Sequence, residues 1–219
     1  MKKVIERLAE AKYSDAWFDF DYGLVIDTSI YSSGQFVDFV GDIPQNVLAT
    51  TRIGDRITLT SLQVKIVVSP WQQGAGNIDS PLIESFFLRC IIFSWRDSTM
   101  PTLEDVIELA DDLSPYGDFR IINSPLKHSK RVQRKIWYDK TTCHYHEYTT
   151  STSTWNPVQQ IEIYIPITQY RQVYYSPADL GVVNRLCMLL VSNVSPESEI
   201  NSRIPWPTYM TYRVNFKDV

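Results

Sequence analysis

Two histidines two residues apart, His144 and His146, are the side chains of this sequence best suited to hold a metal ion. Residues two apart in a β-strand point to the same side, so both imidazoles could ligate one ion. Glu147 follows directly and points to the opposite side, and no histidine occurs after His146 to complete a ligand set. The sequence therefore predicts no metal site and no cofactor.

The patterns of covalent and acid–base catalysis do not occur in the sequence. It holds no Gly-x-Ser-x-Gly, and the segment GAGN at 74–77 lacks the Lys-Ser/Thr of a phosphate-binding loop. Paired carboxylates such as Asp111 and Asp112 are expected in solvated loops, because nothing around them indicates a pocket. We predict no catalytic residue and no enzymatic activity.

Charge is concentrated in two segments. Seven acidic residues and no Lys or Arg lie between positions 97 and 118. Six basic residues, here called the basic strip, follow at Lys127, Lys130, Arg131, Arg134, Lys135 and Lys140. The strip could contact the phosphates of a nucleic acid, or it could protect the edge of a sheet, because Lys and Arg block edge-to-edge pairing. The separation of the two segments predicts a molecule with one acidic side and one basic side.

The composition indicates which elements position these residues. The chain has 219 residues and a net charge of -4, and Val, Ile, Thr and aromatic residues make up more than a third of it. These residue types favour strands, which argues against a helical bundle or a doubly wound α/β enzyme. No apolar run reaches the roughly 18 residues that a transmembrane helix needs, so we expect a soluble protein made inside the cell. Three widely spaced cysteines are predicted to be reduced and buried: Cys90, Cys143 and Cys187.

Alternation of apolar and polar residues, interrupted by turn-rich segments, predicts nine strands. They are Phe20–Thr28, Arg56–Val68, Ile83–Trp95, Gly117–Ile122, Val132–Asp139, Thr142–Tyr148, Val158–Ile167, Arg185–Ser192 and Thr208–Phe216. In Arg56–Val68 the apolar face switches midway, which predicts a bulge. The run Phe86–Phe93 is apolar on both faces, which predicts a central strand covered on both sides.

Two short helices are predicted, at 2–12 and at 101–110. In the second, Thr102 is the expected N-cap and Asp105 has the capping-box spacing. The predicted fold is all-β: a single antiparallel jelly-roll sandwich of about eight core strands with Greek-key connections, long loops and one short helix. Residues 1–19 are expected to be an N-terminal segment, helical or disordered, and residues 20–219 the jelly-roll domain.

Four segments resemble, in type and order, the capsid proteins of small circular single-stranded DNA viruses that encode a replication initiator, the circovirus-like group. They are RIGDRI (52–57) with the strand after it, ESFFLRCIIFSWRDST (84–99) leading into PTLEDVIEL (101–109), FRIINSP (119–125) with KRVQRKIWYDKT (130–141), and NRLCMLLVSN (184–193). Together they cover roughly residues 50–215. None of these motifs is catalytic.

The resemblance implies a structural subunit that self-assembles into a small icosahedral shell, with T=1 as the expected symmetry, around a circular single-stranded DNA genome. Its implied partners are further copies of itself, the genome, which it would bind without sequence specificity, and an unidentified host receptor, with no membrane partner. The implied location is the virion, with assembly inside the host cell and the nucleus as one candidate compartment. Members of the family usually begin with a long basic arm, whereas residues 1–12 here carry a surplus of only two basic residues. The basic strip is therefore the predicted interior DNA contact.

Two other functions fit the same sequence. One is a jelly roll that binds carbohydrate or another ligand through loop aromatics such as Trp71, Trp155 and Trp206. The other is a metalloprotein similar to the cupins, which are also jelly rolls and open their metal site with a His-x-His pair. His144 and His146 would be its ligands.

Overall fold

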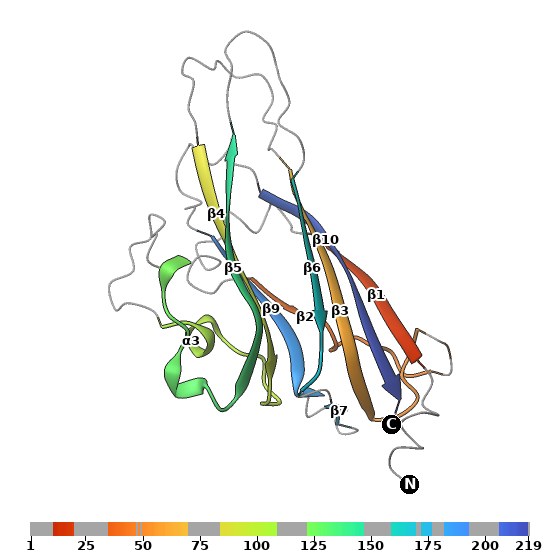
Figure 1. The fold of residues 1–219 in the computed structure, drawn as a ribbon. Helices are drawn as coiled ribbons and strands as arrows, with labels where there is room; N and C mark the ends of the chain where they lie inside the picture. The colour runs from red at the N-terminus through yellow and green to blue at the C-terminus, as the bar shows by residue number, and fades with distance from the viewer. Residues whose placement is uncertain are drawn as a thin grey trace.

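The computed structural model describes residues 11–19, 35–46, 48, 50–69, 84–108, 122–146, 159–169, 172–176, 182–192 and 206–218. Within these residues the strands pair antiparallel and form two sheets, and the helical segments are single short turns (Figure 1). The all-β prediction is confirmed.

The first sheet, here called the β3 sheet, has the order β1-β10-β3-β7-β8, with β6 also paired to β3. β6 pairs with residues 61–68 of β3 and β7 with residues 56–58, so both follow one edge of that long strand. The strands are β1 (Ala11–Asp19), β3 (Arg56–Ser69), β6 (Gln159–Pro166), β7 (Gln172–Tyr175), β8 (Val182–Val183) and β10 (Trp206–Asp218).

The second sheet, here called the β4 sheet, has the order β2-β9-β4-β5. Its strands are β2 (Gln35–Asp38), β4 (Glu84–Trp95), β5 (Arg134–His146) and β9 (Arg185–Ser192). The described residues of the connection between β4 and β5 include the helical turn α3 (Leu103–Val106) and the 3-10 turn η2 (His128–Lys130). Figure 1 shows α3 beside β4 and β5, away from the β3 sheet.

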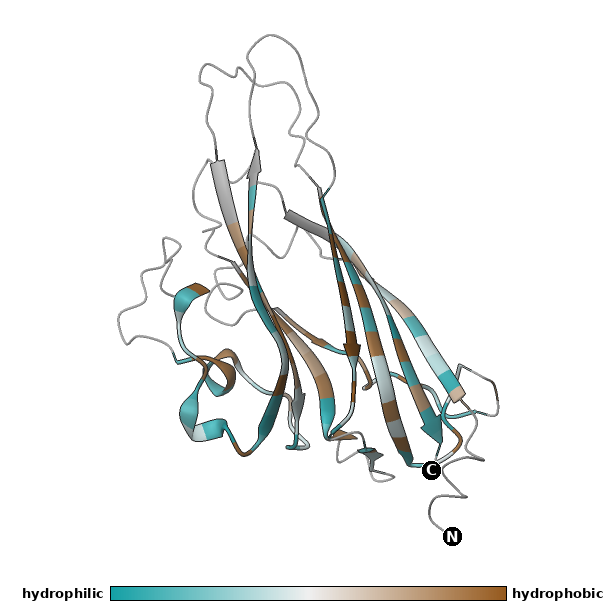
Figure 2. Ribbon diagram, in the orientation of Figure 1, coloured by the Kyte–Doolittle hydropathy of each residue, from teal (hydrophilic) through white to brown (hydrophobic). Residues whose placement is uncertain are grey.

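The main core lies between the two sheets. Leu62, Val64 and Ile66 of β3 point into it, and Leu88 and Ile92 of β4 meet them from the other sheet. Side chains that alternate along a strand point to opposite faces, so each of these strands presents one apolar face to the core. Figure 2 shows this alternation as brown and teal bands along β3 and β10.

A second apolar cluster covers the other face of the β4 sheet. Ile91, Phe93 and Trp95 of β4 pack there against Leu103 and Val106 of α3. The central strand β4 is therefore buried on both faces, as the sequence predicts. Thr102 and Asp105 also behave as predicted, because the backbone N–H and the hydroxyl of Thr102 both donate to Asp105 Oδ2, at 3.0 and 3.1 Å.

The bulge predicted inside the long strand is present at Thr60 of β3. Leu59 pairs with Phe216 of β10 and Ser61 with Asn215, so Thr60 is an extra residue in β3. The core side chains are odd-numbered before it, at Ile57 and Leu59, and even-numbered after it, at Leu62, Val64, Ile66 and Val68. The bulge thus keeps the apolar side chains on the core face along the whole strand.

The N-terminal prediction is wrong for residues 11–19, which form β1 at the edge of the β3 sheet, paired along their whole length with β10. Residues 1–10 lie outside the described residues. The signal in the sequence is the alternation of inward Lys12, Ala16 and Phe18 with exposed Asp15 and Trp17. The pattern is hard to recognise because a lysine, normally an exposed residue, occupies an inward position. Lys12 can be buried there because its ammonium lies 2.7 Å from Asp218 and donates to the Thr51 carbonyl oxygen at 3.1 Å.

The two strands predicted at Val132–Asp139 and Thr142–Tyr148 are not separate, because β5 is one continuous strand from Arg134 to His146, paired with β4 on both sides of a bulge. The short strands β2, β7 and β8 were not predicted. The predicted strand at 20–28 lies outside the described residues, as does 117–121 of the strand predicted at 117–122.

All three cysteines are free thiols, as predicted. Cys90 and Cys187 are buried, whereas Cys143 is exposed, which corrects the prediction for that residue. Among the described residues, no helix is both long and apolar enough to cross a bilayer.

Candidate nucleic-acid interface

The basic strip lies at the edge of the β4 sheet. β5 is the last strand of that sheet, and the strip runs through η2 and the turn after it into β5. A position on an edge strand is what the edge-protection alternative requires, because Lys and Arg prevent an edge from pairing with another chain. Contact with nucleic acid stays a prediction. A basic side chain can bind a phosphate only if it is not already paired within the protein, so the partners of each of the six residues decide which of them are available.

Two residues of the strip are neutralised by the acidic segment. Lys130 Nζ lies 3.1 Å from Asp105 Oδ1, and Lys127 Nζ lies 3.1 Å from Glu108 Oε1. Partial burial opposes ionisation of Asp105, but hydrogen bonds from Thr102 and the charge of Lys130 lower the pKa of its carboxyl group. The acidic and basic segments therefore meet in space here, and the predicted separation into an acidic and a basic side is wrong for these residues.

Arg134 stabilises the polypeptide backbone. Its Nη1 donates to the carbonyl oxygens of Asp105 and Val106, at 2.9 and 2.7 Å, and its Nη2 donates to the carbonyl oxygen of Lys127. The last carbonyl groups of a helix have no partner inside the helix, and a guanidinium group satisfies them well. Arg134 thus ties α3 to the start of β5 and is not free to contact a phosphate.

The other three residues of the strip make no ion pair with any acidic side chain in the described part of the chain. Arg131 and Lys140 are exposed, and Lys135 Nζ lies 5.8 Å from the centre of the Trp137 ring. β5 is bulged at Trp137, since Ile92 pairs with Tyr138 and Phe93 with Ile136. These three cations are the part of the strip that remains available to a polyanion.

The strip is also divided between two faces of its sheet. Lys135 pairs with Ser94 and Lys140 with Cys90, on the side of β4 that faces the β3 sheet. Arg134 pairs with Trp95, on the side that α3 covers. A single flat ligand therefore cannot contact all six cations at once.

The most buried charged group of this region is Arg89 of β4, which is 7% exposed and was not predicted from the sequence. Its Nε and Nη2 each donate to one carboxylate oxygen of Asp139 at 2.8 Å, and its Nη1 donates to the carbonyl oxygens of Ile122 and Ser124. A buried charge is tolerated only when it is paired and hydrogen-bonded in this way. The signal was an arginine inside an otherwise apolar strand, FFLRCIIF, which requires an acidic partner.

Of the histidine pair, the structure describes the side chain of His144, and both of its ring nitrogens are hydrogen-bonded. His144 is buried, its Nε2 lies 2.8 Å from the Thr142 hydroxyl, and its Nδ1 is hydrogen-bonded to Gln159 Oε1. Burial lowers the pKa of His144, which favours the neutral imidazole. The side chain of His146 is not among those described. No group of three potential metal ligands occurs among the described residues.

Comparison with known proteins gives no family model that matches the chain and no similar curated protein.

Proposed function

We propose that this chain is a structural capsid subunit that self-assembles into a small icosahedral shell around a circular single-stranded DNA genome. The order of the strands carries the proposal. When the short strands β7 and β8 are set aside, the order is β1-β10-β3-β6 in the β3 sheet and β2-β9-β4-β5 in the β4 sheet. If these eight strands are numbered consecutively along the chain, the two orders are 1-8-3-6 and 2-7-4-5. This interleaving of two four-stranded sheets supports a jelly roll, a fold used by viral capsid proteins, lectins and cupins.

The contacts between the capsid-like segments favour the capsid among these classes. Arg89 belongs to the segment 84–99, its partner Asp139 belongs to 130–141, and the carbonyl groups of Ile122 and Ser124 belong to 119–125. One guanidinium group thus connects two of the four segments on which the resemblance is based, and it joins the two stretches, 119–125 and 130–141, of one of them. Segments that resemble a family in order and also bind one another are better support than isolated matches.

The turn in the first of the four segments, RIGDRI (52–57), has a defined structure. Arg52 donates to the carbonyl oxygens of Ile43 and Gly54, at 3.3 and 2.6 Å, and its guanidinium lies 4.0 Å from the centre of the Tyr175 ring. Arg52 therefore holds the chain in position where it enters β3, which gives the Arg-Ile-Gly-Asp segment a structural role.

In this proposal Arg131, Lys135 and Lys140 contact the genome, and Lys127, Lys130 and Arg134 hold α3 against β5. Each cation that neutralises a phosphate releases a counterion from the DNA, and this release drives binding. With only three cations, binding to the DNA is expected to be weak, sensitive to salt and independent of base sequence. Further copies of the chain and the DNA are the proposed partners, and the virion is the proposed location. No cofactor takes part.

Assembly is tested on the full chain by size-exclusion chromatography and electron microscopy. We expect closed particles of uniform size that elute far ahead of a 25.4 kDa monomer. A protein that stays monomeric across a range of salt concentration and pH contradicts the proposal.

The DNA contact is tested separately by the nucleic-acid-to-protein absorbance ratio of purified particles. The triple variant Arg131→Gln, Lys135→Gln, Lys140→Gln is expected to form shells that contain less nucleic acid. A matched control, Arg56→Gln, Lys65→Gln, Lys217→Gln, removes the same amount of charge from the β3 sheet and should package normally. Equal nucleic-acid content in the two variants contradicts the assignment of the strip but not the shell.

A further inference from the structure

The outer face of the β3 sheet, turned away from the core, carries large aromatic side chains in solvent. Trp17 of β1 is 71% exposed and Tyr164 of β6 is 65% exposed, and Tyr13 and Tyr209 are also exposed. A tryptophan buries a large apolar area when it finds a partner, so one left this exposed on a regular strand is a candidate for contact with a ligand.

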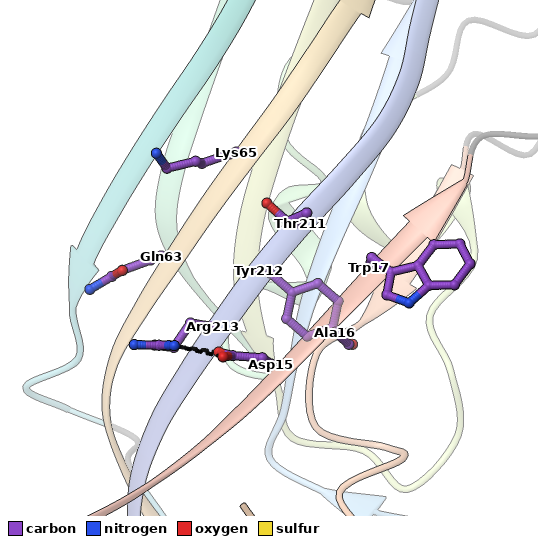
Figure 3. A pocket seen from close by; sticks show the side chains of 8 residues that line it. All are labelled: Asp15, Ala16, Trp17, Gln63, Lys65, Thr211, Tyr212 and Arg213. Carbon is purple, nitrogen blue, oxygen red and sulfur yellow. Dashed lines mark hydrogen bonds and ion pairs between the residues drawn. The ribbon is translucent and has the colours of Figure 1, made fainter.

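A shallow groove of about 420 Å³ crosses this face over β1, β10 and β3. Its volume lies in the range of small-molecule sites. In Figure 3, Trp17 lies at the β1 end and Gln63 and Lys65 lie at the β3 end, with an ion pair between Asp15 and Arg213 in the middle. The residues that line the groove thus combine the aromatic ring of Trp17 with several polar side chains on the surface of the sheet.

The charges in the groove are already paired. Arg213 Nε and Nη2 each donate to one oxygen of Asp15 at 2.6 Å, and the guanidinium lies 4.6 Å from the centre of the Tyr13 ring. These hydrogen bonds lower the pKa of the Asp15 carboxyl group. Lys65 Nζ lies 3.1 Å from Glu162 Oε1. The groove therefore has no excess of positive charge, and its polar atoms are held in a fixed arrangement.

The paired groups keep free hydrogen-bonding capacity. A guanidinium has five N–H donors and Arg213 uses two of them on Asp15, while a carboxylate accepts about four hydrogen bonds and Asp15 receives two from Arg213. Donors and acceptors thus stand next to each other, with the Gln63 amide beside them in the groove. Neighbouring hydroxyl groups, each of which donates and accepts, match this arrangement.

We propose that this groove binds a saccharide, with the C–H face of a pyranose ring on Trp17 and its hydroxyl groups on Asp15, Arg213 and Gln63. A nucleic acid would also stack on Trp17, but it requires unpaired cations that the groove does not have. A second copy of the chain would require an apolar centre, whereas the middle of this groove is an ion pair. The inference stands independently of the capsid proposal.

Saturation-transfer NMR on the full chain tests the site with three disaccharides, cellobiose, lactose and chitobiose. We expect transfer to the ring protons of at least one of them. Trp17→Ala should weaken that binding by at least about tenfold, the loss of one well-packed aromatic contact. Gln63→Ala, which removes a polar contact, should weaken it less. The matched control is Tyr164→Ala, an equally exposed aromatic on the same face outside the groove, which should bind like the wild type.

Two results overturn the inference: no transfer to any of the three disaccharides, or binding that Trp17→Ala leaves unchanged. Quenching of Trp17 fluorescence by a single-stranded oligothymidylate, without saccharide binding, also overturns it and identifies the face as a nucleic-acid surface. Because the variants lie outside the basic strip, particle formation in the same samples reports separately on the capsid proposal.

Discussion

Arg89 with Asp139 and Arg213 with Asp15 form the same bidentate pair on the two sheets, but in different surroundings. The side chains of the first pair are 9% and 26% exposed, and Arg89 also binds two backbone carbonyl groups. Both side chains of the second pair are 46% exposed and border an open groove. Removing charges from water is costly, so the first pair is an obligatory part of the packing, whereas water solvates either partner of the second when the other is removed. The burial of an ion pair, and not the pair itself, determines how much it contributes to the stability of the fold.

The largest effect is expected from breaking the buried pair. Asp139→Ala leaves the Arg89 charge buried with only carbonyl partners, and we expect it to lower the free energy of unfolding by about 3 kcal/mol. Urea denaturation followed by circular dichroism measures the change. The double variant Arg89→Leu, Asp139→Leu should recover much of the loss, because it removes both charges together. If the double variant is no more stable than Asp139→Ala, the unpaired charge of Arg89 is not the cause of the lost free energy of unfolding.

The next largest effect is expected from Arg134, which supports the same side of the β4 sheet. Arg134→Gln removes the hydrogen bonds to the carbonyl groups of Asp105, Val106 and Lys127, and we expect a loss of about 2 kcal/mol in the free energy of unfolding. Lys135→Gln, one residue further along β5, is the matched control and should change stability little. Hydrogen exchange of the α3 amides should increase in the Arg134 variant alone.

A smaller effect is expected from the pH dependence of His144. Its folded-state pKa is lowered by burial, so the unfolded chain binds a proton more readily than the folded one. The stability that neutral His144 contributes is therefore complete above its ordinary pKa of 6.5 and decreases as the pH falls below it. Unfolding measured from about pH 7 to about pH 5 should show this decrease in the wild type and a weaker one in His144→Gln. A steeper decrease in the variant would contradict the assignment.

The smallest effect on stability is expected from the exposed pair. Asp15→Ala should leave the free energy of unfolding close to that of the wild type, because water solvates the released Arg213. The same denaturation experiment that measures Asp139→Ala tests it. A loss as large as that of Asp139→Ala would remove the distinction drawn between the two pairs.

The fold follows from the sequence where a strand has a clear apolar run or a clear alternation of its own. Arg185–Ser192 forms with the predicted bounds, and the predicted Ile83–Trp95 and Val158–Ile167 are close to β4 and β6. The bulge at Thr60 and the capping of α3 by Thr102 and Asp105 are also local patterns. Where a polar residue occupies an inward position, as Lys12 does in β1, the alternation is hidden and the prediction is wrong.

The candidate site is less predictable than the fold. Its six basic residues are evident in the sequence, but their availability depends on partners that are distant along the chain. Glu108 is 19 residues from Lys127, and Asp105 is 25 residues from Lys130, so no local pattern shows that both cations are neutralised. The groove on the β3 sheet was not predicted at all, because it needs Trp17 and Arg213 on neighbouring strands from the two ends of the chain.

The all-β class follows from the amino-acid sequence alone, because β-branched and aromatic side chains in alternation suit a half-buried strand whatever its neighbours are. The sequence also determines where charge is abundant. Which of these charges are paired depends on the folded chain, since the pairing of β4 with β5 brings Arg89 to Asp139, 50 residues further along the chain. Coulombic and hydrogen-bonding energies depend on distance in space, so the charges that function can use are defined only after the strands have paired.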